Sequence, residues 1–113
     1  MWWIVADLLD RGVAETYASW FRALADPSRV QIVEYLARQG RPMPVGEIVA
    51  AAGLAQSTVS QHLKVLTEVR FVLVEAVGNA RHYRINGNCI ACFPSAADLV
   101  MGRPAPSTVG ACE

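Results

Sequence analysis

Apolar residues recur at intervals of three and four along much of the chain, a spacing typical of amphipathic helices. The pattern predicts a first helix over residues 14–25 and a second over residues 27–40. Asp26 can cap the second helix, and Pro27 suits its first turn because the missing N–H would have no partner there. Gly40 can end the helix in a left-handed conformation.

Two shorter helices are predicted after a loop over residues 40–44. One spans residues 45–52 and is closed by Gly53. The next has residues at core-facing spacing, namely Val59, His62, Leu63 and Leu66. Two short helices joined by a turn that contains glycine form a helix-turn-helix.

Farther along the chain the apolar period changes from helical to alternating. Residues 71–74 and 81–85 are predicted strands, and residues 77–80 supply the turn of a β-hairpin. A last helical stretch runs from Ile90 to Val100. Pro94 interrupts it, so we expect either a kink or the start of a new helix at this proline.

The chain has 113 residues, of which 53% are hydrophobic. This length suits one domain, mainly α-helical with a β-hairpin, over residues 1–102, with a flexible tail over residues 103–113. The apolar content is high for so short a chain and indicates an additional buried surface, most simply between subunits. The apolar runs are too short to cross a bilayer. Three cysteines without an export signal favour the reducing cytoplasm.

The net charge is zero, but residues 56–84 carry +2 and each flanking segment carries −1. This block is the place to seek an anionic partner. It includes the polar face of the second helix of the predicted helix-turn-helix, formed by Gln56, Ser57, Thr58, Ser60, Gln61 and Lys64. Small hydroxyls let a helix enter the major groove of DNA, glutamine pairs with adenine edges, and lysine neutralises a phosphate.

Two arginines lie near the tip of the predicted hairpin. Arg81 and Arg84 suit a wing that contacts phosphates or an adjacent groove. They complete a set of eight candidate DNA-binding residues. His62 has core-facing spacing, which favours a packed, neutral histidine over a base contact.

Three segments together resemble the ArsR/SmtB family of bacterial repressors. In the family's order they are residues 21–29, 56–66 and 81–85, and the similarity runs from about Tyr17 to Ile85. The resemblance implies a winged helix-turn-helix of about five helices with a two-stranded wing, and no enzymatic activity. It further implies a homodimer that binds a palindromic operator in double-stranded DNA and is released by an effector.

The resemblance also implies that the first and last helices form the dimer interface. The residues available for it are Trp2, Trp3, Trp20, Phe93, Ala97, Val100 and Met101. The alternative for the two N-terminal tryptophans is packing against the chain's own core.

The sequence departs from the family pattern at both ends of the second helix of the helix-turn-helix. Ala55 stands where the family usually has a capping serine or threonine, so Gln56 or Ser57 would have to cap instead. Arg70 stands where the family often has glycine. Either the turn into the wing is not left-handed, or Arg70 is strained.

The two effector sites common in the family have no counterpart here. Residues 43–47 contain no thiol, and the last helix contains no histidine. Cys89 and Cys92, three residues apart, share one face of a helix and can hold a soft metal ion or arsenite. Cys112 or a thiol of a second subunit can complete trigonal coordination. Buried structural cysteines and a thiol redox sensor remain as alternatives.

A different class of function is also open. A winged-helix module that binds a protein, or a thiol metal carrier, would share the fold without binding DNA. A thiol enzyme is disfavoured because the chain has neither a glycine-rich phosphate loop nor a carboxylate pair. Steep weakening of binding as salt rises distinguishes a DNA-binding protein from these alternatives.

Overall fold

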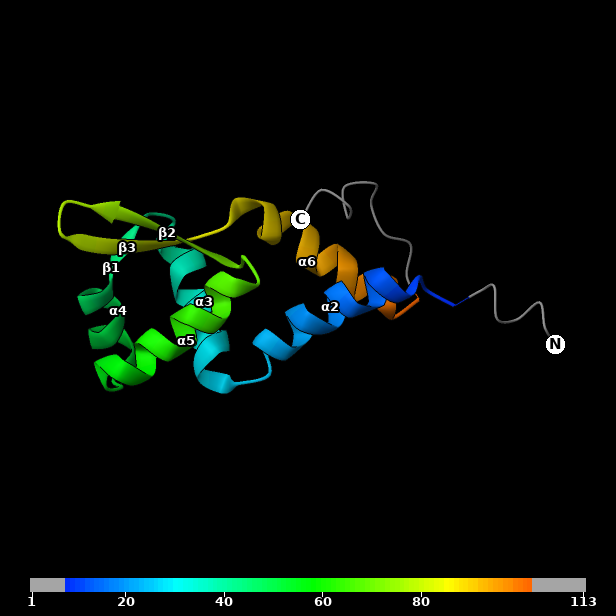
Figure 1. The fold of residues 1–113 in the computed structure, drawn as a ribbon, viewed down its shortest axis with the longest axis horizontal. Helices are drawn as coiled ribbons and strands as arrows, with labels where there is room; N and C mark the ends of the chain where they lie inside the picture. Colours follow the sequence, from blue (N-terminus) through cyan, green and yellow to red (C-terminus); the bar gives the residue numbers. More distant parts are fainter. Residues whose placement is uncertain (1–7, 103–113) are drawn as a thin grey trace.

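The computed structural model describes residues 8–102, apart from the side chains of residues 89–92 and 95. This part of the chain forms five helices and one small sheet (Figure 1). In chain order the elements are α2 (Arg11–Ala23), α3 (Pro27–Gln39), β1 (Met43–Pro44), α4 (Val45–Ala52), α5 (Gln56–Glu68), β2 (Val72–Val77), β3 (Ala80–Ile85) and α6 (Gly87–Val100). The predicted mainly helical domain with a winged helix-turn-helix is confirmed.

The start of α3 follows the prediction from its sequence. The Asp26 carboxylate accepts hydrogen bonds from the backbone amides of Ser28, at 2.8 Å, and of Arg29, at 3.3 Å. Pro27 is the first helical residue, and Gly40 closes the helix at a φ of +64°. Each of these signals lies next to the helix end that it marks, which is why the sequence located both ends of this helix.

The bounds of α2 differ from the prediction of residues 14–25. The helix begins at Arg11 because the Asp10 carboxylate accepts from the amide of Val13 at 3.2 Å. It ends at Ala23, two residues before the predicted end, because Asp26 has extended backbone in order to cap α3.

The sheet has three antiparallel strands in the order β1-β3-β2. The predicted hairpin is confirmed as β2 and β3. The predicted loop over residues 40–44 was wrong at its last two residues, because Met43 pairs with Tyr83 and Pro44 with His82. Pro44 lacks an N–H and is tolerated because it ends an edge strand.

The core lies where α3, α4, α5 and the sheet meet, and it continues onto α2 and α6. Its buried apolar residues are Tyr17, Trp20, Ala23, Ile32, Leu36, Met43, Ile48, Val59, Leu63, Leu66, Phe71, Val72 and Ala96. Figure 1 shows α2 and α6 leaving this body together on the side away from the hairpin. Aromatic contacts tie them to it, with the Phe93 ring 5.3 Å from that of Phe71 and 5.4 Å from that of Phe21.

α6 passes through Pro94 as one helix from Gly87 to Val100. The expected start of a new helix at Pro94 was therefore wrong. Proline cannot donate to the preceding turn, and this costs the helix one backbone hydrogen bond. The aromatic contacts of Phe93 hold the chain in place at this point.

The end of α5 is a Schellman motif with an arginine at the position that usually holds glycine. The Phe71 amide donates to the Leu66 carbonyl at 3.0 Å, and the Arg70 amide donates to the Thr67 carbonyl at 3.1 Å. Arg70 has a φ of +65°, the one positive value at a non-glycine residue in the described part of the chain. The turn is thus left-handed, and Arg70 is strained.

Replacing Arg70 with glycine should raise the free energy of unfolding by about 1 kcal/mol. A side chain in this conformation costs about 1–2 kcal/mol, and the greater freedom of glycine in the unfolded chain cancels part of the gain. Urea unfolding followed by circular dichroism measures the difference. Arg70→Ala is the matched control, because it removes the arginine but keeps the strained Cβ. Equal stability of the two variants would contradict the assignment.

Candidate nucleic-acid interface

α5 turns one apolar face inward and one polar face outward. Val59, Leu63 and Leu66 are fully buried. All six predicted DNA-contacting residues of this helix are exposed. The helix begins at Gln56, and Ala55 makes no side-chain capping bond. The cap expected from Gln56 or Ser57 is therefore absent, and neither residue shifts the start of the helix.

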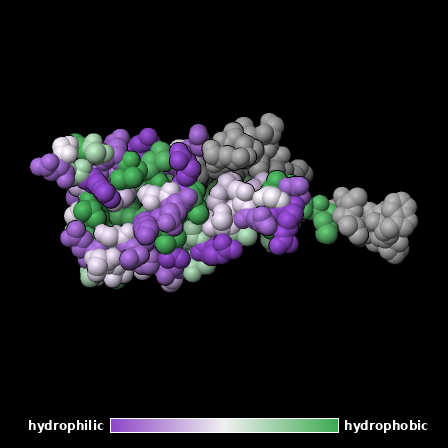
Figure 2. Space-filling view, viewed as in Figure 1, coloured by the Kyte–Doolittle hydropathy of each residue, from purple (hydrophilic) through white to green (hydrophobic). Residues whose placement is uncertain are grey.

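A groove of about 770 Å³ separates α5 from the hairpin. We call it the α5–wing groove. It is lined by Pro44, Val45, Gly46, Gln56, Ser60, Gln61, Lys64, Thr67, Val74, Asn79, Ala80, Arg81 and Tyr83. In Figure 2 hydrophobic residues lie between the hairpin and α5, flanked by hydrophilic ones. The lining of the groove thus combines apolar residues, such as Val45 and Val74, with polar ones.

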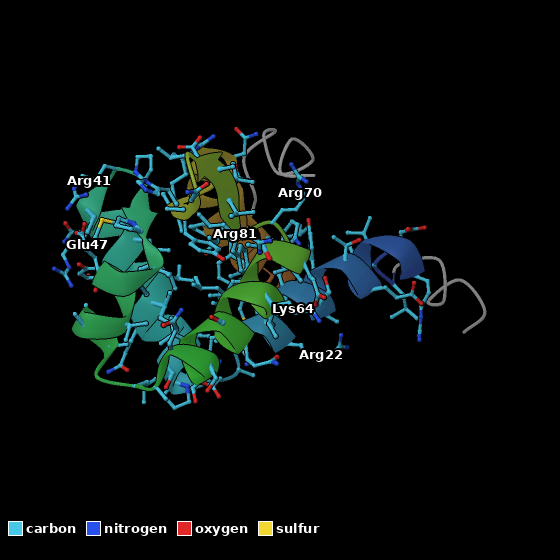
Figure 3. All side chains as sticks on the ribbon, turned by 60° about the vertical axis from the view of Figure 1, so that its left-hand side comes forward. Arg22, Arg41, Glu47, Lys64, Arg70 and Arg81 are labelled. Atoms are coloured by element: carbon cyan, nitrogen blue, oxygen red, sulfur yellow. The ribbon has the colours of Figure 1, made fainter. Side chains whose placement is uncertain are left out.

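Five of the eight predicted DNA-binding residues line this groove, namely Gln56, Ser60, Gln61, Lys64 and Arg81. In Figure 3 Lys64 and Arg81 lie on neighbouring elements, α5 and the hairpin. Ser57 and Thr58 are exposed in the first turn of α5, outside the groove lining.

Arg84 does not join the groove. It is three residues from Arg81 in the same strand, so the two side chains leave opposite faces of the sheet. Arg84 pairs with Leu73, whereas Arg81 pairs with Ala76. His82, two residues before Arg84 in β3, shares its face of the sheet. The structure thus separates two arginines that the sequence had grouped together.

Eight groove residues were not predicted from the sequence, namely Pro44, Val45, Gly46, Thr67, Val74, Asn79, Ala80 and Tyr83. The helical period offered a signal for Thr67, because it lies three residues after Lys64 on the same face. Strand alternation offered one for Tyr83, two residues after Arg81. Val74 needed the register of the hairpin, in which it pairs with Tyr83.

The two cationic side chains that line the groove, Lys64 and Arg81, have no carboxylate partner among the described residues. Arg11, Arg38 and Arg41 form ion pairs with Glu15, Glu34 and Glu47 on other parts of the surface. Figure 3 shows the Arg41–Glu47 pair well away from Lys64. Within residues 8–102, neither Lys64 nor Arg81 has an acidic side chain within ion-pair distance. Their charge is available to an anion.

The His62 side chain of α5 packs against the start of α3 instead of facing the groove. Its side chain is 14% exposed, and its Nε2 lies 4.0 Å from the Asp26 carboxylate. Its Nδ1 lies 3.4 Å from the Arg29 guanidinium, which can only donate. In a neutral ring the proton therefore sits on Nε2, toward Asp26. Arg29 also donates to the Ala23 carbonyl, so this contact joins the end of α2, the start of α3 and α5.

The Asp26 carboxylate is stabilised in its charged form at this junction. Partial burial raises the pKa of this carboxyl group. Hydrogen bonds from the Arg29 and Ser28 amides, and the nearby His62 and Arg29 side chains, lower the pKa by more than burial raises it. The net effect is a pKa below the usual aspartate value. Asp26 therefore keeps its capping charge at neutral pH.

The comparisons with known proteins agree with this geometry. Residues 26–73 match the model of the bacterial regulatory protein, arsR family. The transcriptional regulator NmtR of Mycobacterium tuberculosis is 37% identical over 83 residues, which cover 74% of this chain and 68% of that protein. The chain belongs to the ArsR family. This is a family of transcriptional regulators and not of enzymes, as the sequence indicated.

Two further similarities bear on the ArsR assignment. The "Probable mercury resistance operon repressor" of Streptomyces lividans is 36% identical over 87 residues, or 77% of this chain. The match spans only 63% of that longer protein. The solution structure of the homodimeric winged helix-turn-helix domain of Mb0332 from Mycobacterium bovis has a TM-score of 0.65 and 30% identity. The similarity covers 85% of this chain and 89% of the Mb0332 chain.

The expected ArsR dimer interface is only partly accessible. Val100 and Met101 are exposed at the end of α6, and Met101 reaches 78%. Leu8, before α2, is 74% exposed.

Trp20 was expected at this interface, but it is 6% exposed within the single chain, where it packs on Tyr17, Phe71 and Phe93. Phe93 and Ala97 are half-buried.

The remaining predictions concern residues outside the described part of the chain. These are Trp2, Trp3, Cys112 and the side chains of Cys89 and Cys92. Among the described residues, no three histidine, cysteine or acidic side chains gather to hold a metal ion. Within the same range, no helix is long and apolar enough to cross a membrane.

Proposed function

We propose that this ArsR-family chain is a transcriptional repressor that binds a specific DNA operator through α5 and the hairpin. The observation that carries the proposal is the α5–wing groove. It places uncharged hydrogen-bonding residues beside two cations, Lys64 and Arg81, that have no acidic partner among residues 8–102. Glutamine and serine read base edges, whereas lysine and arginine neutralise phosphates. The groove thus offers both kinds of contact that operator binding needs.

The proposed roles follow the position of each side chain. Gln61 and Ser60 lie in the middle of the exposed face of α5 and would read bases in the major groove. Lys64, one turn farther along, and Arg81, on the hairpin, would bind the phosphates on either side. Ser57 and Thr58, in the first turn, would contact base edges, as N-terminal residues of recognition helices commonly do.

The proposed active form is a homodimer. Apolar residues are exposed before α2 and at the end of α6, and a second subunit would bury them. The similar Mb0332 domain is homodimeric. A twofold axis would present two copies of α5 to successive major grooves of one DNA face. The operator is then palindromic, because its symmetry mirrors that of the protein. A repressor that binds a bacterial operator would act in the cytoplasm.

We further propose that thiols of α6 receive the effector. Cys89 and Cys92 lie three residues apart in α6. Residues at this spacing share a helix face. The similar Streptomyces protein is named for mercury resistance, and mercury and arsenite both bind thiolates. Cys112 or a thiol of the other subunit would supply a third ligand.

Gln61→Ala should weaken binding to the operator by about 1–3 kcal/mol and leave binding to scrambled DNA unchanged, because a base contact carries sequence information. Fluorescence anisotropy on the DNA upstream of the gene measures both affinities, with the scrambled duplex as control. Equal loss on both duplexes would assign Gln61 to the backbone instead. Absence of any salt-sensitive binding by the wild-type protein would favour a protein-binding module.

Arg81→Ala should weaken binding to every duplex alike and reduce the slope of log K against log salt by about 1, the value for one lost phosphate contact. Arg84→Ala is the matched control, since it removes the same charge from the opposite face of the same strand. It should change the slope much less. Equal effects of the two substitutions would show that general charge, not the groove, determines the binding.

Arsenite should release the reduced protein from the operator at a near-stoichiometric concentration, and Cys89→Ser should abolish the release while leaving operator affinity intact. The loss of one thiolate leaves too few soft ligands. Anisotropy of the preformed complex follows the release, with Arg11→Ala as a remote control. Release by an oxidant but not by arsenite or mercuric ion would replace metal sensing by redox sensing.

A further inference from the structure

Asn86 occupies the junction between β3 and α6 and is the one polar residue buried in the described part of the chain, at 9% exposure. Burying an amide is unfavourable unless its donor and acceptor groups are hydrogen-bonded. Both groups of the Asn86 side chain have partners, and the partners lie on different elements. The residue is therefore a link between two parts of the molecule.

The first half of this link is the cap of α6. The side-chain oxygen of Asn86 accepts from the Asn88 amide at 3.1 Å, which satisfies a donor in the first helical turn. The position of this turn is thereby tied to the position of the Asn86 side chain.

The second half reaches the end of the recognition helix. The Nδ2 group of Asn86 donates to the Arg70 carbonyl at 2.8 Å. Its backbone amide donates to the Phe71 carbonyl at 2.9 Å. Arg70 is the left-handed residue that closes α5, and Phe71 donates back to Leu66 in the last turn of that helix.

A parallel apolar contact joins the same two elements. The Phe93 ring of α6 packs edge-to-face on Phe71 at a centroid distance of 5.3 Å, and both rings contact Trp20. α6 thus contacts Arg70 and Phe71, just beyond the end of α5, by the polar contact of its N-cap residue Asn86 and by the aromatic contact of Phe93. Movement of the first turn of α6 must break the Asn86 bonds or carry the Arg70 turn with it.

We propose that Asn86 is a positioning residue that couples α6 to the recognition helix, holding the strained Arg70 turn in the geometry that operator binding requires. The inference rests on the proposed DNA-binding function of α5. The coupling operates through the bond from Nδ2 to the Arg70 carbonyl, not through the helix cap alone.

Asn86→Ser and Asn86→Asp separate the two halves of the link. Serine and aspartate are both good helix caps, so α6 keeps its first turn. Neither can donate to the Arg70 carbonyl as the amide does: serine is too short, and an ionised carboxylate only accepts. Both variants should remain folded and in the wild-type oligomeric state, as circular dichroism and sedimentation velocity measure. Both should bind the operator at least tenfold more weakly.

Rescue distinguishes a positioning role from a general structural one. Glycine adopts the left-handed conformation without strain, so the Arg70 turn no longer needs the Asn86 bond. The double variant Asn86→Ser, Arg70→Gly should recover the operator affinity of Arg70→Gly alone. Wild-type affinity in folded Asn86→Ser, or a failure of glycine to rescue the loss, would overturn the proposal.

The DNA-free protein gives a test that is independent of the proposed function. In amide nuclear magnetic resonance spectra, Asn86→Ser should shift Arg70, Phe71 and the last turn of α5. Shifts confined to Gly87 and Asn88 would reduce Asn86 to a simple cap and overturn the inference. If the wild-type protein binds no DNA but these α5 shifts occur, the proposed function fails while the coupling stands.

Discussion

Burial of Val59, Leu63 and Leu66 against the rest of the core is the interaction on which the candidate interface depends. Each buried aliphatic side chain contributes about 1.5–3 kcal/mol, so rotation of α5 about its axis would be very unfavourable. The positions of residues around a helix are set by its geometry. With the apolar face locked inward, Gln61 and Lys64 must face outward. The interface is therefore determined by what the helix buries.

The groove beside α5 depends on how the chain leaves that helix. The left-handed Arg70 reverses the chain within one residue, and Phe71 returns at once to the core beside Leu66. β2 begins at Val72, so the hairpin starts against the helix that precedes it. The strain at Arg70 is thus offset by contacts on both sides of it. The same turn receives Asn86, which makes it the meeting point of the recognition helix, the hairpin and α6.

Predictions from the sequence succeeded where the determining signal is local. Asp26 and Gly40 mark the ends of α3 by chemistry that acts within a single turn. β1 was missed because a two-residue strand exists only through its pairing with β3, some forty residues away. At Pro94 the sequence left open either a kink or the start of a new helix, and the structure has one helix through the proline. Local preference opposes the helix there, and the packing of Phe93 on distant aromatic rings overrides it.

In the candidate site, too, some features follow from local sequence signals and others from contacts between distant segments. The sequence by itself determined which residues share the polar face of α5, because a helical period of 3.6 residues requires no knowledge of the partner. It also determined the family, through three short segments in a fixed order. Only the tertiary structure decided which face of the hairpin, and therefore which arginine, meets the groove, that Trp20 is buried within its own subunit and that Asn86 reaches the end of α5. These outcomes depend on contacts between segments far apart in the chain, which no local pattern encodes.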